Sequence, residues 1–206
     1  MKSHVLLLSL PLVLTAACGD PPVRIRADQE QASQAAEPSP VHGDAAGSDS
    51  VHGSTSPFKF VEQEGWISEP PSNNFRKAQY RLPAVEGDPD DATLVVITFP
   101  GGGTVDDNFT RWCMQFLQDD GRPSTEAAAR DVEEREGFRF HTIDVSGRYV
   151  AETQPGSGER VNLPEYRLLG CVIETGGSPY FVKMVGPAET MERWQASFYA
   201  FLKAMV

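Results

Sequence analysis

The chain changes character near residue 57, and this change limits which residues can form a core. Residues 19–56 consist mainly of Pro, Ala, Gly, Ser, Gln and acidic residues, and they contain no Phe, Trp or Tyr. A segment of that composition cannot bury enough apolar surface to offset the entropy lost on ordering. We therefore expect residues 18–56 to form a disordered tether and residues 57–206 to form one folded domain with a real core.

Residues 1–17 have the order of parts that is typical of an export signal. Lys2 supplies a short basic region, VLLLSLPLVL an apolar stretch, and two alanines precede a cysteine. The apolar stretch is too short to span a bilayer, which takes about 20 residues. The motif LTAAC at 14–18 resembles the bacterial lipobox, which implies cleavage before Cys18 and its lipidation. The alternative is an ordinary signal peptide with a cysteine nearby.

The lipobox resemblance also predicts a location and a first partner. Diacylglycerol on Cys18 would anchor the exported chain in the lipid bilayer of a bacterial cell envelope. Gly19 supplies no acidic retention signal after the cysteine. In a cell with two membranes we therefore expect the outer membrane or the periplasmic face.

The charge of the chain excludes several classes of partner. Loss of the leader removes Lys2 and no acidic residue, which takes the formal net charge from −11 to −12. Such a chain is a poor ligand for nucleic acid, because that binding depends on neutralising phosphates with Lys and Arg. The repeated Val-His-Gly at 41–43 and 51–53 is the only internal sequence repeat, and we interpret it as linker composition rather than as a metal site.

The folded part shows strand patterns that are separated by turn signals. AQYRLP at 78–83 and ATLVVITF at 92–99 predict two antiparallel strands, with DPDD between them as a chain break. Residues 138–151 predict a strand, 155–164 a long loop, and 166–186 a hairpin. A last helix is expected to begin at Gly186-Pro187, and its apolar face comprises Met191, Trp194, Phe198, Phe201, Leu202 and Met205.

A second helix is predicted after the glycines at 101–103. Thr104 is the expected N-cap, with Asp106 and Asp107 in the first turn. The apolar residues at helical spacing are Val105, Phe109, Trp112, Phe116 and Leu117. Residues 124–135 contain an alanine triplet and many charges but no wide apolar stripe, so a surface helix and a loop both remain open.

RWCMQF at 111–116, KMVGP at 183–187 and the order of predicted elements resemble the PsbP-like fold. That fold is shared by an extrinsic photosystem II subunit and the Ran-binding Mog family. The chain also resembles a group of bacterial lipoproteins that have a Gly-rich turn before an RW-x-x-QF helix. The resemblance implies an α+β domain, an antiparallel sheet with helices packed on it as an α/β/α sandwich. It transfers no functional residues, because function does not follow from fold.

The motifs of common enzymes are missing from the sequence. FPGGGTVDDN at 99–108 lacks the GxGxxG and GK[ST] patterns, and its aspartates would repel a phosphate, so we interpret it as a structural turn. His141 is the only histidine of the folded part, and a strand residue is the simpler interpretation than a catalytic base. With no CxxC, HExxH or GxSxG, we expect no metal, no cofactor and no enzymatic role.

Two cysteines remain after lipidation. Cys113 and Cys171 are an even pair in an oxidising compartment, which allows a disulfide. Both lie among apolar residues, where a free cysteine serves as a small core hydrophobe. Both alternatives stay open at this point.

Arg111 is the centre of the candidate binding site. Gln115 lies one helical turn on, and Asp144, Arg148 and Tyr149 would complete a pocket between helix and sheet edge where the guanidinium holds a carboxylate. The structural alternative is that Arg111 pairs with an acid one turn back, Asp107. Glu133 and Glu134 are expected to form a solvated face.

Two function classes follow from these features. The first is a non-enzymatic, membrane-anchored envelope protein whose domain binds another envelope protein or stabilises an assembly. The second is a small-ligand-binding or weakly catalytic domain that uses the pocket around Arg111.

Overall fold

The computed structural model describes residues 56–153 and 156–206. Cys18, the predicted leader and the tether up to residue 55 lie outside these residues. The elements, in chain order, are β1 (Ile67–Ser68), β2 (Arg76–Leu82), β3 (Ala92–Thr98), α1 (Val105–Cys113), β4 (Phe116–Leu117), α2 (Ser124–Ala127), β5 (Ala129–Arg135), β6 (Phe138–Tyr149), β7 (Leu163–Glu174), β8 (Tyr180–Pro187) and α3 (Ala188–Ala204).

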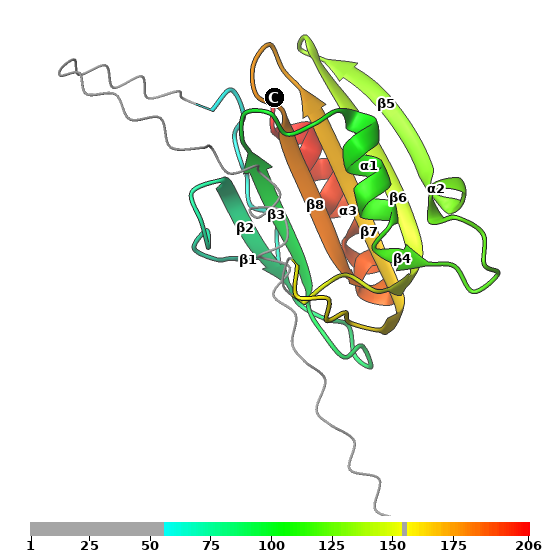
Figure 1. Cartoon of the computed structure of the whole chain (residues 1–206). Coiled ribbons are helices and arrows are strands. Elements are labelled where there is room, and N and C mark those ends of the chain that lie inside the picture. Colours follow the sequence, from blue (N-terminus) through cyan, green and yellow to red (C-terminus); the bar gives the residue numbers. More distant parts are fainter. Residues whose placement is uncertain (1–55, 154–155) are drawn as a thin grey trace, which may run out of the picture.

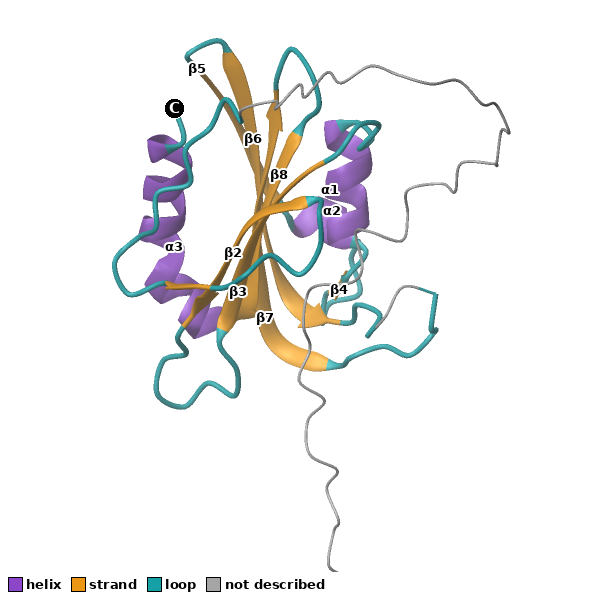
Figure 2. Cartoon of the chain, turned by 90° about the vertical axis from the view of Figure 1, so that its left-hand side faces the viewer, coloured by secondary structure: helices purple, strands orange, loops and turns teal. Residues whose placement is uncertain are grey.

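The strands form one antiparallel sheet in the order β1-β2-β3-β8-β7-β6-β4, and β5 also pairs with β6. Helix α3 covers one face, and α1 and α2 lie on the other (Figures 1 and 2). We call these the α3 face and the α1 face. The α+β architecture of an antiparallel sheet with helices packed on it is thus confirmed, and β2 pairs with β3 as expected.

Strand β8 occupies the centre of the sheet, and all eight of its residues are buried. Alternate side chains of a strand point to opposite faces. Tyr180, Val182 and Met184 therefore join the core on the α3 face, whereas Phe181 and Val185 join the core on the α1 face. This alternation assigns every residue of the central strands to a face.

Helix α3 fills the α3 face with the apolar residues that the sequence pattern predicts. Met191, Trp194, Phe198, Phe201, Leu202 and Met205 are all at most 8 % exposed. They pack with alternate residues of β2, β3, β7 and β8 in one cluster. Burial of side chains this large is the main contribution to the stability of such a domain.

Helix α1 covers only part of the opposite face. Trp112, which is fully buried, lies over Gly170 of β7, where a Cβ atom would stand 2.4 Å from the indole. The glycine thus lets the helix approach the sheet closely. Figure 1 shows α1 in front of the β6–β7 side of the sheet, with β2 and β3 beyond its reach.

Two sequence predictions about elements are wrong in part. The helix that begins at Val105 ends at Cys113, and Phe116 and Leu117 belong to β4, which pairs with β6. Residues 124–135 form the short α2 followed by β5, a strand whose residues are exposed except for the half-buried Arg135. Because both sides of β5 face solvent, its sequence carries no alternation of apolar and polar residues.

The loop at 84–91 fastens the β2–β3 connection to two other elements. Asp88 accepts hydrogen bonds from the backbone N and Oγ1 of Thr190 in the first turn of α3, at 2.8 and 2.5 Å. Asp90 accepts from the Tyr166 hydroxyl at 2.8 Å. Burial and this carboxylate both raise the pKa of Tyr166. The acidic DPDD turn is therefore part of the packing.

Among the described residues, no helix has both the length and the apolar composition needed to cross a bilayer.

Candidate functional site

Arg111 braces the loop before its own helix. Its Nη2 donates to Asn108 Oδ1 at 2.8 Å, and the buried Asn108 amide donates to the carbonyls of Gly102 and Thr104 at 2.8 and 2.7 Å. Asp107 is engaged by Thr104 instead, in a capping box at the N-cap residue that the sequence predicts. Hydrogen bonds from Thr104, and to a smaller extent the charge of Arg111, lower the pKa of Asp107.

The Gly-rich loop has a packing role. A Cβ on Gly102 would stand 2.5 Å from the Phe181 ring, and Gly103 has a φ of +78° that favours glycine. The helix N-terminus already holds the Asp107 carboxylate, which accepts from Thr104 N at 3.1 Å and from its Oγ1 at 2.7 Å. These contacts explain why glycine occurs at these positions, and no bound phosphate is needed to explain it.

The five candidate binding residues do not assemble around Arg111. Gln115 and Tyr149 are buried on the α1 face, and Arg148 donates to Asn162 at 3.2 Å. Asp144 lies on the α3 face, because it follows Ile143 of the α1-face core by one residue. The predicted carboxylate pocket between Arg111 and Asp144 is therefore wrong, since the sheet separates its two halves.

Asp144 instead belongs to a tie between the sheet and α3. Arg167 on β7 binds it in a bidentate manner, with Nε to Oδ1 at 2.9 Å and Nη2 to Oδ2 at 2.7 Å. The same guanidinium contacts Glu192 at 2.8 Å and Gln195 at 2.5 Å on the helix. The hydrogen bonds to Asp144 raise the pKa of Arg167. This network has a structural role.

Cys113 and Cys171 are both free and buried. Cys113 belongs to the core of the α1 face and Cys171 to that of the α3 face, so the sheet lies between them. Burial raises the pKa of both thiols. Of the two alternatives left open by the sequence, the structure has the core thiols and no bridge.

His141 lies on β6 as expected, and its Nε2 is 2.8 Å from Glu174 Oε2 on β7. Within residues 56–153 and 156–206, no group of three His, Cys, Asp or Glu side chains could hold a metal ion.

A buried lysine that the sequence analysis missed stands on the α1 face. Lys183 of β8 is 5 % exposed, and its cross-strand neighbours are Val95 on β3 and Gly170 on β7. Its Nζ donates to Gln115 Oε1 at 2.7 Å. Gln115 lies two residues after the end of α1, and its carbonyl accepts from Val150 N at 2.8 Å. The amine is thus held at a defined position beside the helix.

A second buried cation lies two strands away on the same face. Arg76 of β2 is 4 % exposed and is the cross-strand partner of Ile97. Its Nη1 donates to Gln79 Oε1 at 3.0 Å, and Gln79 Nε2 donates to Glu69 Oε2 at 3.0 Å. The network continues from Glu69 to Arg81 at 3.3 Å.

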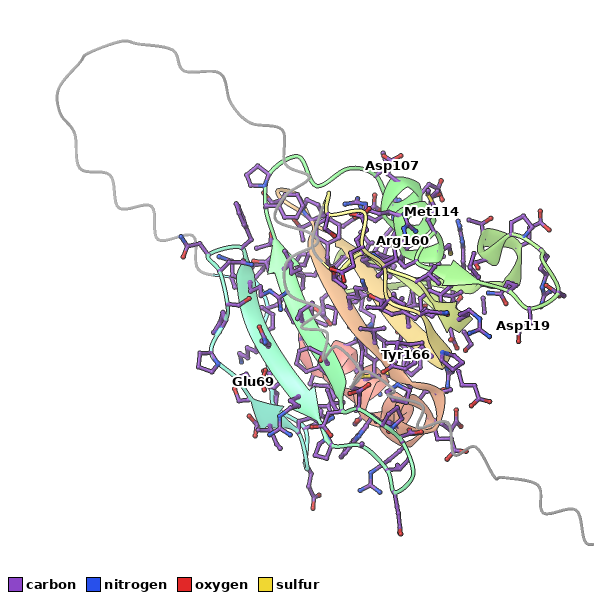
Figure 3. The ribbon with its side chains drawn as sticks, turned by 60° about the horizontal axis from the view of Figure 1, so that its bottom comes forward. Glu69, Asp107, Met114, Asp119, Arg160 and Tyr166 are labelled. Carbon is purple, nitrogen blue, oxygen red and sulfur yellow. The ribbon has the colours of Figure 1, made fainter. Side chains whose placement is uncertain are left out.

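We call the set Arg76, Gln79, Val95, Gln115 and Lys183 the Lys183–Arg76 surface. Gln79, Val95 and Lys183 are successive cross-strand partners on β2, β3 and β8, so they form one row across the sheet. In Figure 3, Glu69 marks the β2 side of this face, and Met114 and Arg160 mark the α1 side. Two cations held by two amides can donate to carboxylate or other anionic groups.

The signal for this surface was present in the sequence. Lys183 interrupts YFVKMVG, an otherwise apolar strand, and a charge inside such a run must be satisfied in the interior. Arg76 is the first residue of β2, and the register shifts between Arg76 and Ala78, so counting alternate residues along the sequence does not give the face on which Arg76 lies.

No protein-family model and no curated protein sequence matches the chain. Among solved structures, it is similar to cyanobacterial PsbP (CyanoP) from Synechocystis sp. PCC 6803, with 12% identity, 73% of this chain and 86% of that chain covered, and a TM-score of 0.43. It is also similar to PA94 from Pseudomonas aeruginosa, a protein of unknown function described as a putative regulator. There the identity is 11%, the coverage 72% and 96%, and the TM-score 0.43. The first of these proteins bears the name of the family that the sequence resembles.

Proposed function

We propose that the chain is an exported, lipid-anchored envelope protein whose domain binds an acidic partner protein through the Lys183–Arg76 surface. The anchor is Cys18, and residues 18–56 give the domain its distance from the bilayer. The observation that carries the binding role is the placement of two cations, each at most 5 % exposed, on the α1 face of the sheet.

Stability alone does not account for cations at these positions. Removing an ammonium or guanidinium group from water costs several kcal/mol per ion, in order of magnitude, and apolar residues of similar volume often give an equally stable core. The α3 face illustrates that solution, with aromatic and aliphatic residues throughout its centre. Cations retained in the interior therefore support a role in recognition.

The neighbouring side chains orient the two cations for anionic groups. Gln115 and Gln79 each accept one hydrogen bond, which fixes the position of the charged group. Charge-assisted hydrogen bonds to carboxylates are about twice as strong as neutral ones. Glu69, which contacts Gln79, already illustrates a carboxylate bound at the margin of the surface. A partner segment rich in Asp and Glu fits this chemistry.

The anchor is tested by metabolic labelling with an alkyne-bearing palmitate in the native host. We expect the label on the wild-type chain and none on Cys18→Ala, which would also leave the membrane fraction. A soluble, unlabelled wild-type chain would contradict the anchor.

The binding role is tested by photocrosslinking in intact envelopes. A photoreactive phenylalanine analogue replaces Phe75, which is 40% exposed and precedes Arg76. A matched control carries it at Tyr199, which is 42% exposed on α3. We expect a discrete adduct at position 75 that is lost in Lys183→Met and absent at position 199. Equal adducts at both positions, or an adduct that persists in Lys183→Met, would contradict the proposal.

A further inference from the structure

Strand β5 forms a free edge of the sheet. It pairs with β6 from Ala129 to Arg135, and β6 holds β7 on its other side. Figure 1 shows β5 along the margin of the sheet, with α2 leading into its start. Within residues 56–153 and 156–206, no strand pairs with the outer side of β5. An edge of seven residues with unpaired backbone groups is a template for another strand.

The hairpin turn after β5 determines which backbone groups point outward. Glu136 and Gly137 have φ values of +49° and +80°, which are typical of a two-residue type I′ turn. The residues that flank such a turn, Arg135 and Phe138, form a hydrogen-bonded pair. Every second residue of the strand then directs its N–H and C=O groups away from β6. The residues with outward backbone groups are Arg130, Val132 and Glu134.

The three outward residues are complementary to themselves about Val132. A two-fold axis through Val132 places Arg130 opposite Glu134 of a second copy, and Val132 opposite its own counterpart. Each of these pairs can exchange both backbone hydrogen bonds, because both of its members point outward. A shift by one residue sets outward groups against inward ones, and a shift by two leaves an outward residue without a partner in β5. The geometry therefore favours one closed, isologous pairing.

The side chains of the outward residues favour the same register. Arg130 is the cross-strand partner of Ile143, so these side chains lie on the α1 face. The register forms two Arg130–Glu134 pairs between the copies, and opposite charges directly across from each other stabilise strand pairing. It also covers Val132, an apolar side chain that is 56% exposed.

The α3 side of this register contains two pairs that oppose it. Asp131 would face Glu133 of the second copy, and like charges directly opposite are destabilising. Arg135 Nε lies 3.2 Å from Glu133 Oε1 and reduces this repulsion. On the α1 side, Arg130 already contacts Asp106 at 3.1 Å, so its attraction is divided between two acids. These opposing contributions predict a weak, reversible dimer.

We propose that two copies of the chain pair along β5 as an antiparallel two-fold dimer, which joins their sheets into one. The axis is perpendicular to the sheet, so the α1 faces of both copies lie on the same side. Strand β5 and the β1–β2 side occupy opposite margins of the sheet, so the pairing leaves the Lys183–Arg76 surface uncovered. The dimer does not depend on the proposed function, since it uses a different part of the molecule.

The pairing is tested by sedimentation equilibrium on the mature chain with Cys18→Ala, which carries no lipid. This chain should dimerise reversibly. Arg130→Glu turns both Arg130–Glu134 pairs into pairs of like charge, and Glu134→Arg does the same, so each variant should weaken the dimer about tenfold. A mixture of the two variants restores opposite charges at both pairs and should associate as a heterodimer.

Matched controls make the same changes of charge outside β5. Lys203→Glu and Glu64→Arg alter exposed side chains, and both variants should dimerise like the starting chain. Asp131→Asn removes the two repulsive pairs and should tighten the dimer about two- to tenfold. A starting chain that stays monomeric overturns the inference. So does a mixture of Arg130→Glu and Glu134→Arg that associates no better than either variant alone.

An introduced thiol tests the position of the axis. The Cα atoms of a hydrogen-bonded pair lie about 5.5 Å apart, which a disulfide can bridge. Val132→Cys should therefore give a covalent dimer on mild oxidation. Val61→Cys, at a valine that is 48% exposed, is the matched control and should stay monomeric, and Cys113 and Cys171 are buried. Equal yields of covalent dimer from the two variants would overturn the two-fold pairing.

Discussion

The two faces of the sheet differ in the length of the helix that covers them and in the charged side chains that they bury. On the α3 face, a helix of 17 residues seals an apolar core, and its charged tie, Arg167 with Asp144, Glu192 and Gln195, is saturated with partners. On the α1 face, a helix of 9 residues covers part of the sheet, and two cations, Lys183 and Arg76, are buried on that face. Both faces thus carry an apolar core, and the α1 face buries two cations as well.

The largest effect is expected from the centre of the α3 face. Phe198→Ala removes a fully buried ring and leaves a cavity, which should lower the free energy of unfolding by about 3–5 kcal/mol. Urea denaturation measures the loss. Tyr199→Ala, which alters the next and exposed ring, should cost much less. Similar losses in the two variants would mean that α3 does not seal the core as described.

On the α1 face, the close contact of α1 with the sheet is the most sensitive point. Gly170→Ala places a methyl group 2.4 Å from the Trp112 indole, so the helix or the ring must shift, at about 1–3 kcal/mol. Thermal melting and the intrinsic fluorescence of the tryptophans report both changes. Gly176→Ala, where a Cβ meets nothing within 4 Å, is the matched control and should be near neutral. A stable Gly170→Ala variant would contradict this packing.

Exchanging one cation on each face for methionine tests the comparison directly. Arg167→Met breaks the bidentate pair and should cost about 1–2 kcal/mol, discounted because Asp144 is partly exposed. Lys183→Met keeps the volume and removes the desolvation cost of the ammonium, so its loss should be smaller. The yield of the photocrosslinked adduct at position 75 should fall more in Lys183→Met than in Arg167→Met. A larger stability loss for Lys183→Met would assign Lys183 a structural role.

The smallest effect is expected at the start of α1. Thr104→Ala removes the N-cap and should cost about 1 kcal/mol at pH 7, measured by urea denaturation. The folded state lowers the pKa of Asp107. The ionised Asp107 carboxylate therefore stabilises the folded state above the unfolded pKa, and this stabilisation is lost as pH falls through the folded pKa. The difference from wild type should therefore shrink between about pH 5 and pH 2. A difference that stays constant over this range would exclude the capping box as its source.

The elements with a regular apolar period could be predicted from the sequence. The face of α3 and the pairing of β2 with β3 follow from the 3.6-residue and two-residue periods of buried side chains. Strand β5 could not be predicted in this way, because both of its sides face solvent and its strand conformation comes from pairing with β6. The end of α1 at Cys113 also depends on tertiary structure, since Phe116 pairs with Tyr149.

The candidate site was harder to predict than the fold. The residue types of Arg111 and Asp144 suggest an ion pair. On β6, however, Asp144 follows Ile143 of the α1-face core by one residue, so its side chain lies on the α3 face. Lys183 was overlooked because one lysine in an apolar run leaves the strand prediction unchanged, although a charge inside such a run is itself a signal. The face on which each charged side chain lies, rather than its residue type, decides which groups it contacts.

The attachment of residues 56–66 determines how the domain responds to mechanical load. Any pull from the N-terminal side of Ser56 first meets the hydrogen bond from the Tyr180 hydroxyl to Ser56 Oγ at 3.1 Å, then Phe58 packed on Tyr180, and then Lys59 N bonded to Met205 O at 3.1 Å. These contacts follow one another along the chain, so tension breaks them one at a time before it reaches the paired strands. The segment should detach at low force as a local event, leaving the sheet and both of its faces intact.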